Sequence, residues 1–543
     1  MKLKSVTVSY NINGNPRTAV FCKSCEKGGA AFDISFSDDR FILNIRSDAS
    51  VCLNEVCAEF EFEYRDDFRL FFNGYQSWTD SREQTIDGRM YRLNKFPKFL
   101  VKKFHLTAYG DIDFVRYGRK KGQMHGFSYA YVRDGGDYTL FGSLCENTGF
   151  TVIRCDTSRN LLTFEKECKG HHFTGEYKAL DIAICKGTED EVFNKWFALL
   201  GINPPCSKRI NGYTSWYNHY DRITEAAIEK DLDAFKTAGI KPDVFQIDDG
   251  YQQKVGDWLC VDVSKFKSGM KAAADSIREQ GITPGLWLAP FAAAKDSRLA
   301  NEHPDLLVCD DDEKPVICGG NWGGFYALDI YNEKVRDYLQ NVFDTVINKW
   351  GFGLVKLDFL YAACILPRRD KTRGEIMHDA MVFLREVCGD ALILGCGVPL
   401  ASAFGLVDYC RIGCDVSLKW DDEPYARFMH RERISTRNTL LDTIYRRQLD
   451  GRAFRNDPDV FLLRSENIHL NDRQKYTLAV TNALFGGVLF TSDNVAEYDE
   501  CKRKLYDMTA SLDKSCFISA VTDGKVTELT FTHDGRNETL IIK

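Results

Sequence analysis

The sequence lacks the features that would place the protein in or on a membrane. The 543-residue chain contains no apolar run long enough to span a bilayer. Its opening segment, MKLKSVTVSYNINGN, has two lysines but turns polar before the apolar stretch of a secretory signal develops. We therefore expect a cytoplasmic protein without a membrane partner.

An excess of positive charge is also missing. Lys and Arg number 71 against 78 Asp and Glu, which gives a net charge of −7. A protein that binds nucleic acid usually presents a basic face, so the composition argues against a nucleic-acid partner. The hydrophobic share of 44% is that of a folded globular chain. Because the chain is too long for one hydrophobic core, we expect two or three domains.

Ligand sets for metals and dinucleotides are absent as well. Cys22 and Cys25 have the spacing of half a zinc site, but no second CxxC and no matching pair of histidines follows. The 19 cysteines are odd in number and scattered, which indicates reduced, mostly buried thiols. No Gly-rich phosphate loop follows the first strand of the α/β region. The sequence predicts no metal and no cofactor.

The first 200 residues read as β-structure. Short alternating runs such as FILNIRSD, EFEFEYRDD, YTLFGSLCE and NLLTFEKE are broken by turn residues, and helical periodicity is nearly absent. This pattern predicts an N-terminal β-sandwich over residues 1–200. The Pro204–Pro205 turn in GINPPCSKR marks the expected end of this domain.

Strands and helices alternate from residue 208 onward. Eight strand candidates follow one another with mostly helical connections: INGYTSW, DVFQIDD, TPGLWLAP, LVKLDF, LILGC, YCRIG, DVFLL and GVLFTSD. Eight βα units in about 300 residues predict a (β/α)8 TIM barrel over residues 208–505. A doubly wound sheet is the competing fold. Residues 506–543, with VTELTFTHDG and ETLIIK, predict a small C-terminal β-domain.

Polar and aromatic residues stand repeatedly at the predicted strand ends, where barrel enzymes place their chemistry. Singly, each has a structural explanation, because an Asp after a strand often caps a helix and a Trp is often core. Together they predict one polar barrel mouth formed by Asp248, Asp249, Trp287, Lys356, Asp358, Cys396, Arg411 and Asp415.

Two carboxylates suggest the chemistry. Asp358 and Asp415 are 57 residues apart, which assigns them to the fourth and sixth barrel strands. A carboxylate pair that flanks a pocket is what glycoside hydrolysis requires. Lys356 lies on the same strand face as Asp358 and would help to keep that carboxyl ionised. A purely structural ion pair remains the alternative explanation for two charges in an apolar strand.

The motifs resemble those of the α-galactosidases of glycoside hydrolase family 36, and most closely the compact bacterial type. The likeness covers nearly the whole chain. It rests on NGYQSW (Asn73–Trp78), YTSWYNHY (Tyr213–Tyr220), VFQIDDGYQ (Val244–Gln252), GLWLAPF (Gly285–Phe291), NEHPD (Asn301–Asp305), KLDFL (Lys356–Leu360), LGCGVPL (Leu394–Leu400), RIGCD (Arg411–Asp415) and NDPD (Asn456–Asp459).

This resemblance implies a role for each candidate residue. Asp358 is the expected nucleophile and Asp415 the expected general acid/base of a retaining double displacement. Asp248 and Asp249 are expected to bind O4 and O6 of galactose, and Lys356 and Arg411 to contact hydroxyls across the ring. The expected pocket walls are Trp287, Trp216 and Tyr217, with Cys396 facing the 2-substituent and Trp78 reaching over the barrel mouth from the N-terminal domain.

The expected partner is therefore an α-galactoside oligosaccharide or glycoside. An α-N-acetylgalactosaminidase with the same mechanism and a galactosyl transferase of the raffinose-synthase kind stay open as alternatives. A Schiff-base lysine enzyme, a divalent-metal enzyme and a non-catalytic sugar-binding relative are less favoured. The sequence leaves open whether the protein is a homo-oligomer, and whether Trp78 serves its own barrel or a neighbour's.

Overall fold

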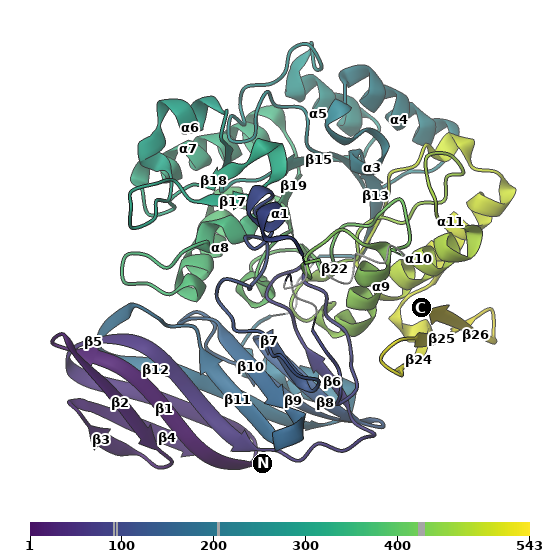
Figure 1. The fold of residues 1–543 in the computed structure, drawn as a ribbon. Helices are drawn as coiled ribbons and strands as arrows, with labels where there is room; N and C mark the ends of the chain where they lie inside the picture. Colours follow the sequence, from purple (N-terminus) through teal and green to yellow (C-terminus); the bar gives the residue numbers. More distant parts are fainter. Residues whose placement is uncertain (91–92, 94–95, 204–206, 422–428) are drawn as a thin grey trace.

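The structure is a computed structural model that describes residues 1–543 apart from 91–92, 94–95, 204–206 and 422–428. The described part consists of an antiparallel β-unit, a parallel barrel and a small C-terminal sheet (Figure 1). The predicted multidomain architecture of β-sandwich, (β/α)8 barrel and C-terminal β-domain is thereby confirmed. The predicted turn at Pro204–Pro205 lies outside the described residues.

The N-terminal unit is a twelve-stranded antiparallel sheet, and its two longest strands, β5 (Arg40–Glu61) and β12 (His171–Gly187), pair with each other and with several shorter strands. The first half of β5 pairs with β4 and the second half with β1, while β12 pairs along the other edge of β5. The remaining strands are β1 (Lys2–Ile12), β2 (Asn15–Phe21), β3 (Cys25–Lys27), β4 (Ala30–Phe36), β6 (Arg69–Phe72), β7 (Gln123–Phe127), β8 (Tyr129–Asp134), β9 (Asp137–Ser143), β10 (Thr151–Asp156) and β11 (Leu161–Lys166).

Alternation along β5 builds the core of this unit. Phe41, Leu43 and Ile45 are fully buried, whereas the residues between them are partly exposed. This two-residue period is the one that predicted the strands. Two helices complete the unit, α1 (Lys98–Lys103) in a long connection and α2 (Glu189–Leu200) at its end.

Parallel strands close the barrel, seen end-on in Figure 1. The order runs β22-β21-β20-β19-β15-β14-β13-β23, and a parallel bridge between Val460 and Phe490 joins the two ends. The strands are β13 (Ile210–Thr214), β14 (Val244–Ile247), β15 (Thr283–Leu288), β19 (Leu354–Leu357), β20 (Leu392–Gly395), β21 (Tyr409–Arg411), β22 (Arg455–Asp457) and β23 (Val488–Thr491).

Helices surround these strands. Thr224 caps α4 (Glu225–Thr237) as predicted, because its hydroxyl accepts a hydrogen bond from Ala227 N. Gly239 follows the helix with a φ of 63°. The others include α3 (Trp216–His219), α5 (Gly269–Glu279), α6 (Arg298–Glu302), α7 (Glu333–Phe343), α8 (Arg373–Cys388), α9 (Thr436–Tyr445), α10 (Asp472–Phe485) and α11 (Glu500–Ser511).

The predicted seventh barrel strand, DVFLL at residues 459–463, is wrong. The strand is β22, four residues earlier. Pro458 has no amide hydrogen to donate, and Asp459 takes a left-handed φ of 71°, so the chain cannot continue as a strand through them. The apolar residues 460–463 are buried because they pack in the core formed with α10 and β23.

A second departure is an inserted antiparallel sheet between the third and fourth barrel strands. It consists of β16 (Ala292–Ala294), β17 (Ile317–Gly319) and β18 (Phe325–Ala327). Each strand is only three residues long, too short for a periodic signal. Trp322 lies in the turn between β17 and β18 and reaches Asp249 at the barrel mouth.

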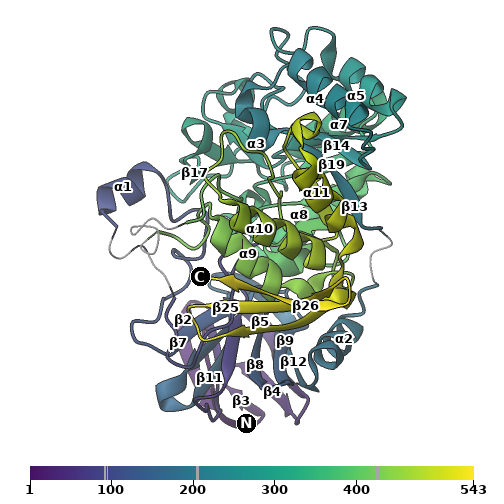
Figure 2. The ribbon, with the colours of Figure 1, turned by 90° about the vertical axis from the view of Figure 1, so that its right-hand side faces the viewer.

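The C-terminal sheet lies against both larger units (Figure 2). Its strands are β24 (Phe517–Thr522), β25 (Thr527–His533) and β26 (Arg536–Ile542). Arg69 of the N-terminal unit donates to Thr522 O at 2.8 Å, and Tyr476 of the barrel donates to Glu538 Oε2 at 2.7 Å. The boundary expected at 505/506 falls inside α11, and we infer that the C-terminal unit begins after that helix.

Candidate active site

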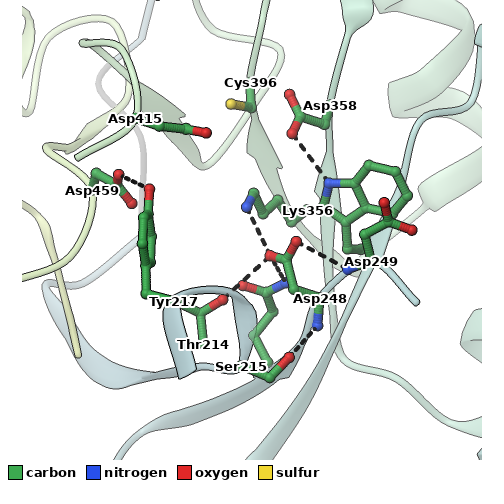
Figure 3. Close-up of polar contacts among 12 residues, drawn as sticks. Thr214, Ser215, Tyr217, Asp248, Asp249, Lys356, Asp358, Cys396, Asp415 and Asp459 are labelled. Carbon is green, nitrogen blue, oxygen red and sulfur yellow. Dashed lines mark hydrogen bonds and ion pairs between the residues drawn. The ribbon is translucent and has the colours of Figure 1, made fainter. Parts of the chain in front are cut away.

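Polar side chains gather at the carboxyl ends of the barrel strands. Arg411 and Asp457 are the last residues of β21 and β22, and Asp248, Asp358 and Cys396 follow β14, β19 and β20 directly. Figure 3 shows Asp358 and Asp415 entering the site from opposite sides, with Cys396 between them and the Lys356–Asp248 pair below. The structure thus brings the predicted charged residues into one mouth.

Lys356 forms an ion pair with Asp248 rather than with Asp358. Its Nζ lies 2.8 Å from Asp248 Oδ2, and Gln246 Nε2 donates to the same oxygen at 2.8 Å. Burial by itself would raise the pKa of Asp248, but the Lys356 ammonium outweighs it and lowers this pKa. Burial likewise works against the charge of Lys356, and the Asp248 carboxylate raises its pKa above the usual value. Both groups therefore stay charged.

Asp358 is held by two donors at the end of β19. Trp287 Nε1 donates to Oδ2 at 3.1 Å, and the amide of Phe359, a residue with a φ of 51°, donates to Oδ1 at 2.8 Å. Burial raises the pKa of Asp358, Lys356 opposes the rise, and Asp415 adds to it. The Trp287 donor and the Lys356 ammonium oppose the rise in this pKa and favour the ionised carboxylate.

Asp249 has partners that the sequence did not reveal. Gln252 Nε2 donates to Oδ1 at 2.6 Å and Trp322 Nε1 donates to Oδ2 at 2.9 Å. Burial raises the pKa of Asp249 to about 6, against the effect of these donors. Trp322 also packs edge-on against Trp287, with ring centroids 6.0 Å apart. Because Trp322 comes from the short inserted sheet, 73 residues away, no local signal marked it.

Three carboxylates surround Arg411. Its Nη1 lies 2.7 Å from Asp415 Oδ1, its Nε 3.1 Å from Asp457 Oδ2 and its Nη2 2.9 Å from Asp459 Oδ1. The Arg411 side chain is only 3% exposed, whereas that of Asp415 is 33% exposed. Arg411 is thus mainly a hub for aspartates. Asp457 and Asp459 belong to the NDPD motif, but the sequence alone indicated no role for either of them.

Trp78 extends from the N-terminal unit over the mouth of its own barrel. Its Nε1 donates to Cys396 Sγ at 3.2 Å, and its ring packs edge-on against Phe359, with centroids 5.1 Å apart. Gly397, with a φ of 59°, leaves room for this contact, since a Cβ there would stand 2.8 Å from the Trp78 ring. The cysteine thiol is thereby covered.

The two remaining candidates occupy different places. Tyr217 donates its hydroxyl to Asp459 Oδ2, within the aspartate cluster. Trp216 is partly buried and packs edge-on against Tyr220, with centroids 5.2 Å apart. No hydrogen bond joins the Trp216 ring to a carboxylate of the described residues.

The arrangement suits acid/base chemistry on an uncharged polar ligand. Two carboxylates, Asp358 and Asp415, face each other across the mouth. A third carboxylate, Asp249, has a pKa of about 6. The indoles of Trp287, Trp322 and Trp78 donate to Asp358, Asp249 and Cys396, so aromatic rings pack beside these groups, and aromatic side chains are common in the walls of ligand sites. Among the described residues, no group of three or more His, Cys, Asp or Glu is placed to hold a metal ion, and no helix is long and apolar enough to cross a membrane.

Comparison with known proteins shows that the chain is similar to glycosidases. The Melibiase family model matches residues 209–388, from β13 to the end of α8. The chain is 27% identical over 186 residues to α-galactosidase 1 of Pediococcus pentosaceus, which covers 32% of this chain and 24% of that protein. It is 27% identical over 207 residues to the A type blood α-D-galactosamine galactosaminidase of Flavonifractor plautii, covering 34% and 19%. The matches span a quarter or less of these relatives.

A solved structure extends the likeness to the whole chain. TtGalA, the α-galactosidase from Thermus thermophilus in complex with p-nitrophenyl α-D-galactopyranoside, has a TM-score of 0.72 and 25% sequence identity to this chain, and the match covers 98% of each. The likeness therefore includes the N-terminal unit and the C-terminal sheet as well as the barrel.

Proposed function

We propose that this chain, a member of glycoside hydrolase family 36 by its Melibiase domain and its full-length structural likeness, is a retaining exo-acting α-galactosidase. It releases terminal α-D-galactosyl residues from oligosaccharides or glycosides. The observation that carries the proposal is the pair of carboxylates, Asp358 and Asp415, on opposite sides of one mouth.

The two carboxylates have distinct roles. Asp358 attacks the anomeric carbon as Asp415 gives its proton to the glycosidic oxygen, so that one C–O bond forms and the other breaks. Asp415 then takes a proton from water, and that water displaces Asp358 and restores both carboxyls. The donors Trp287 and Phe359 N and the nearby Lys356 favour ionised Asp358. Partial burial and the Asp459 carboxylate raise the pKa of Asp415 against the opposite effect of Arg411, and a raised pKa is what a proton donor needs.

Charged groups below the carboxylate pair bind the galactose hydroxyls. Asp248 has a lowered pKa and stays an acceptor at neutral pH. Asp249 is ionised above a pH of about 6. Lys356 and Arg411 supply donors on the other side of the ring. Each of the three Arg411 nitrogens pairs with one aspartate, which leaves one N–H on Nη1 and one on Nη2 for a ligand.

The Trp78–Cys396 contact favours a galactoside over an N-acetylgalactosaminide. We infer from the family resemblance that the 396–398 loop faces the 2-substituent. Here Trp78 covers Cys396, which is 1% exposed, and Ser77 N donates to Val398 O at 2.9 Å, so the loop is fixed. A hydroxyl needs little room on this side, whereas an acetamido group would have to displace the Trp78 ring. The matched galactosaminidase of F. plautii keeps the other substrate as the second candidate.

Turnover of three p-nitrophenyl glycosides tests the proposal: the α-galactoside, the α-N-acetylgalactosaminide and the α-glucoside, each with Asp358→Ala as control. We expect turnover of the α-galactoside that disappears in the variant. A preference for the N-acetyl sugar would support the second candidate, and no turnover of any of the three would contradict the substrate assignment.

We assign the enzyme to the reducing environment of the cytoplasm. The cysteines that the structure describes carry free thiols, and ten of them, including Cys318, Cys364 and Cys396, are buried. Free thiols of this number are usual in reducing compartments. Fractionation of the native cells tests the assignment, and recovery of the enzyme outside the cytoplasm would contradict it.

A further inference from the structure

The carboxylate of Asp459 contacts three groups that surround Asp415. Its Oδ1 pairs with Arg411 Nη2 at 2.9 Å, and its Oδ2 accepts from Val416 N at 2.7 Å and from the Tyr217 hydroxyl. All three partners are donors, which fits an ionised carboxylate. The Asp459 side chain is 1% exposed, and both of its carboxylate oxygens are occupied by donors of the protein itself.

The main chain fixes Asp459 just as firmly. Its amide donates to Asp457 Oδ1 at 2.9 Å, and its carbonyl accepts from Asn482 Nδ2 of α10 at 3.1 Å. The left-handed φ of 71° turns the side chain out of the path of β22. Because hydrogen bonds fix both its amide and its carbonyl, the Asp459 backbone is rigid, and its carboxylate can keep a neighbouring group in position.

We propose that Asp459 is the positioning residue of Asp415, which it acts on in two ways. Through Val416 N it fixes the backbone directly after Asp415. Through its ion pair with Arg411 Nη2 it partly neutralises the guanidinium, so that Arg411 lowers the pKa of Asp415 less than it otherwise would. The inference rests on the proposed role of Asp415 as proton donor, and it adds a residue that does not touch the substrate.

The charges around Asp415 set the expected sign. Of the cations in the described part of the chain, Arg411 and Lys356 lower the pKa of Asp415, while Asp459 raises it. Among the described residues, Asp358 lies across the mouth, Asp457 shares Arg411, and the other titratable neighbours are Tyr217, Tyr220, Cys396 and Cys414. Removal of the Asp459 charge leaves the two cations less opposed, so Asp415 loses its proton at lower pH.

Asp459→Asn tests the proposal in the full-length enzyme. We expect the alkaline limb of the pH profile of kcat/KM for an alkyl α-galactoside to move to lower pH by about 0.5 to 1 unit. We also expect kcat/KM, which reports the first step, to fall about 30- to 100-fold for an alkyl α-galactoside and less than about 5-fold for the 2,4-dinitrophenyl α-galactoside. The dinitrophenolate leaves without a proton, so only the alkyl substrate needs a well-placed acid.

The matched control is Asp408→Asn, at the opposite end of β21. Asp408 also pairs with an arginine, Arg385, at 3.0 Å, and also accepts from a backbone amide, that of Ile393, at 2.9 Å. We expect it to leave the pH profile and the ratio of the two substrates unchanged. Where Asp459→Asn does not fold, Tyr217→Phe removes one donor to Asp459 without a change of charge, and we expect the same substrate dependence at about 3- to 10-fold.

Equal loss on both galactosides with an unmoved alkaline limb would reduce Asp459 to a merely structural residue and overturn the proposal. So would wild-type behaviour of Asp459→Asn, or equal loss on both substrates in Tyr217→Phe. A wild-type chain that hydrolyses neither galactoside would instead overturn the proposed function.

Discussion

A single indole nitrogen tunes the charge of Asp249. Trp322 Nε1 donates to Asp249 Oδ2 at 2.9 Å and lowers its pKa, which burial raises to about 6. Trp322→Phe keeps an aromatic wall and removes only the donor. We expect the pKa of Asp249 to rise further, so that the acid limb of kcat/KM moves to higher pH, while kcat/KM well above neutral pH changes less. Initial rates between pH 4 and 9 measure this shift.

The control for this prediction is Trp196→Phe in the N-terminal core. It also removes one indole donor, the one to Ser143 O at 3.2 Å, at a distance from the barrel mouth. Its acid limb should coincide with that of the wild type. An unchanged limb in Trp322→Phe would show that Asp249 does not control the acid side of the profile.

At the scale of elements, the 396–398 loop and the Trp78 segment depend on one another. Gly397→Ala places a Cβ 2.8 Å from the Trp78 ring at a φ of 59°. We expect the ring to move and kcat/KM for the α-galactoside to fall about 10- to 100-fold, since small displacements of binding groups cost this much. Steady-state kinetics and tryptophan fluorescence measure the change.

Gly389→Ala is the matched control, because Gly389 has a φ of 54° but nothing within 4 Å of an added Cβ. It also requires a residue other than glycine at a positive φ, but without the contact and far from the mouth, so activity should stay near that of the wild type. Equal activities of the two glycine variants would contradict the role assigned to the Trp78 contact.

The elements differ in how well the sequence predicted them. Apolar strand patterns predicted seven of the eight barrel strands, and the helix-capping preference of threonine predicted the cap at Thr224. The seventh strand was predicted too late in the sequence, because the buried apolar run after Pro458 and Asp459 resembles a strand. Trp322 could not be predicted, since its three-residue strands carry no period and its partner Asp249 is distant in sequence. Trp78 reads locally as sandwich core, and only the family likeness directed it to the mouth.

For the molecule as a whole, Arg446 connects the N-terminal unit to the barrel. It is fully buried and donates to Asn73 Oδ1, Ser77 O and Ile412 O at 2.9, 2.7 and 2.7 Å. Arg446→Lys keeps the charge but cannot make these bonds together. We expect a cost on the order of 3 kcal/mol and a drop in thermal midpoint of about 3 °C within one transition.

Arg452→Lys at the same interface is the comparison for Arg446→Lys. Arg452 donates to Asp190 Oδ1 at 2.7 Å, but that partner is 75% exposed. An exposed pair of this kind contributes little, so we expect a shift below about 1 °C. Calorimetry that resolved separate transitions for the two units in the wild type would contradict their mutual dependence.

Azide rescue tests the central claim, that Asp358 and Asp415 are the nucleophile and the acid/base, most directly. With an activated α-galactoside, Asp358→Ala should be inactive until azide attacks from the vacated face and gives β-galactosyl azide. Asp415→Ala should form the galactosyl–Asp358 intermediate, which azide then converts to α-galactosyl azide. NMR of the two products distinguishes the anomers. The same anomer from both variants, or none from either, would contradict the assignment of the two carboxylates.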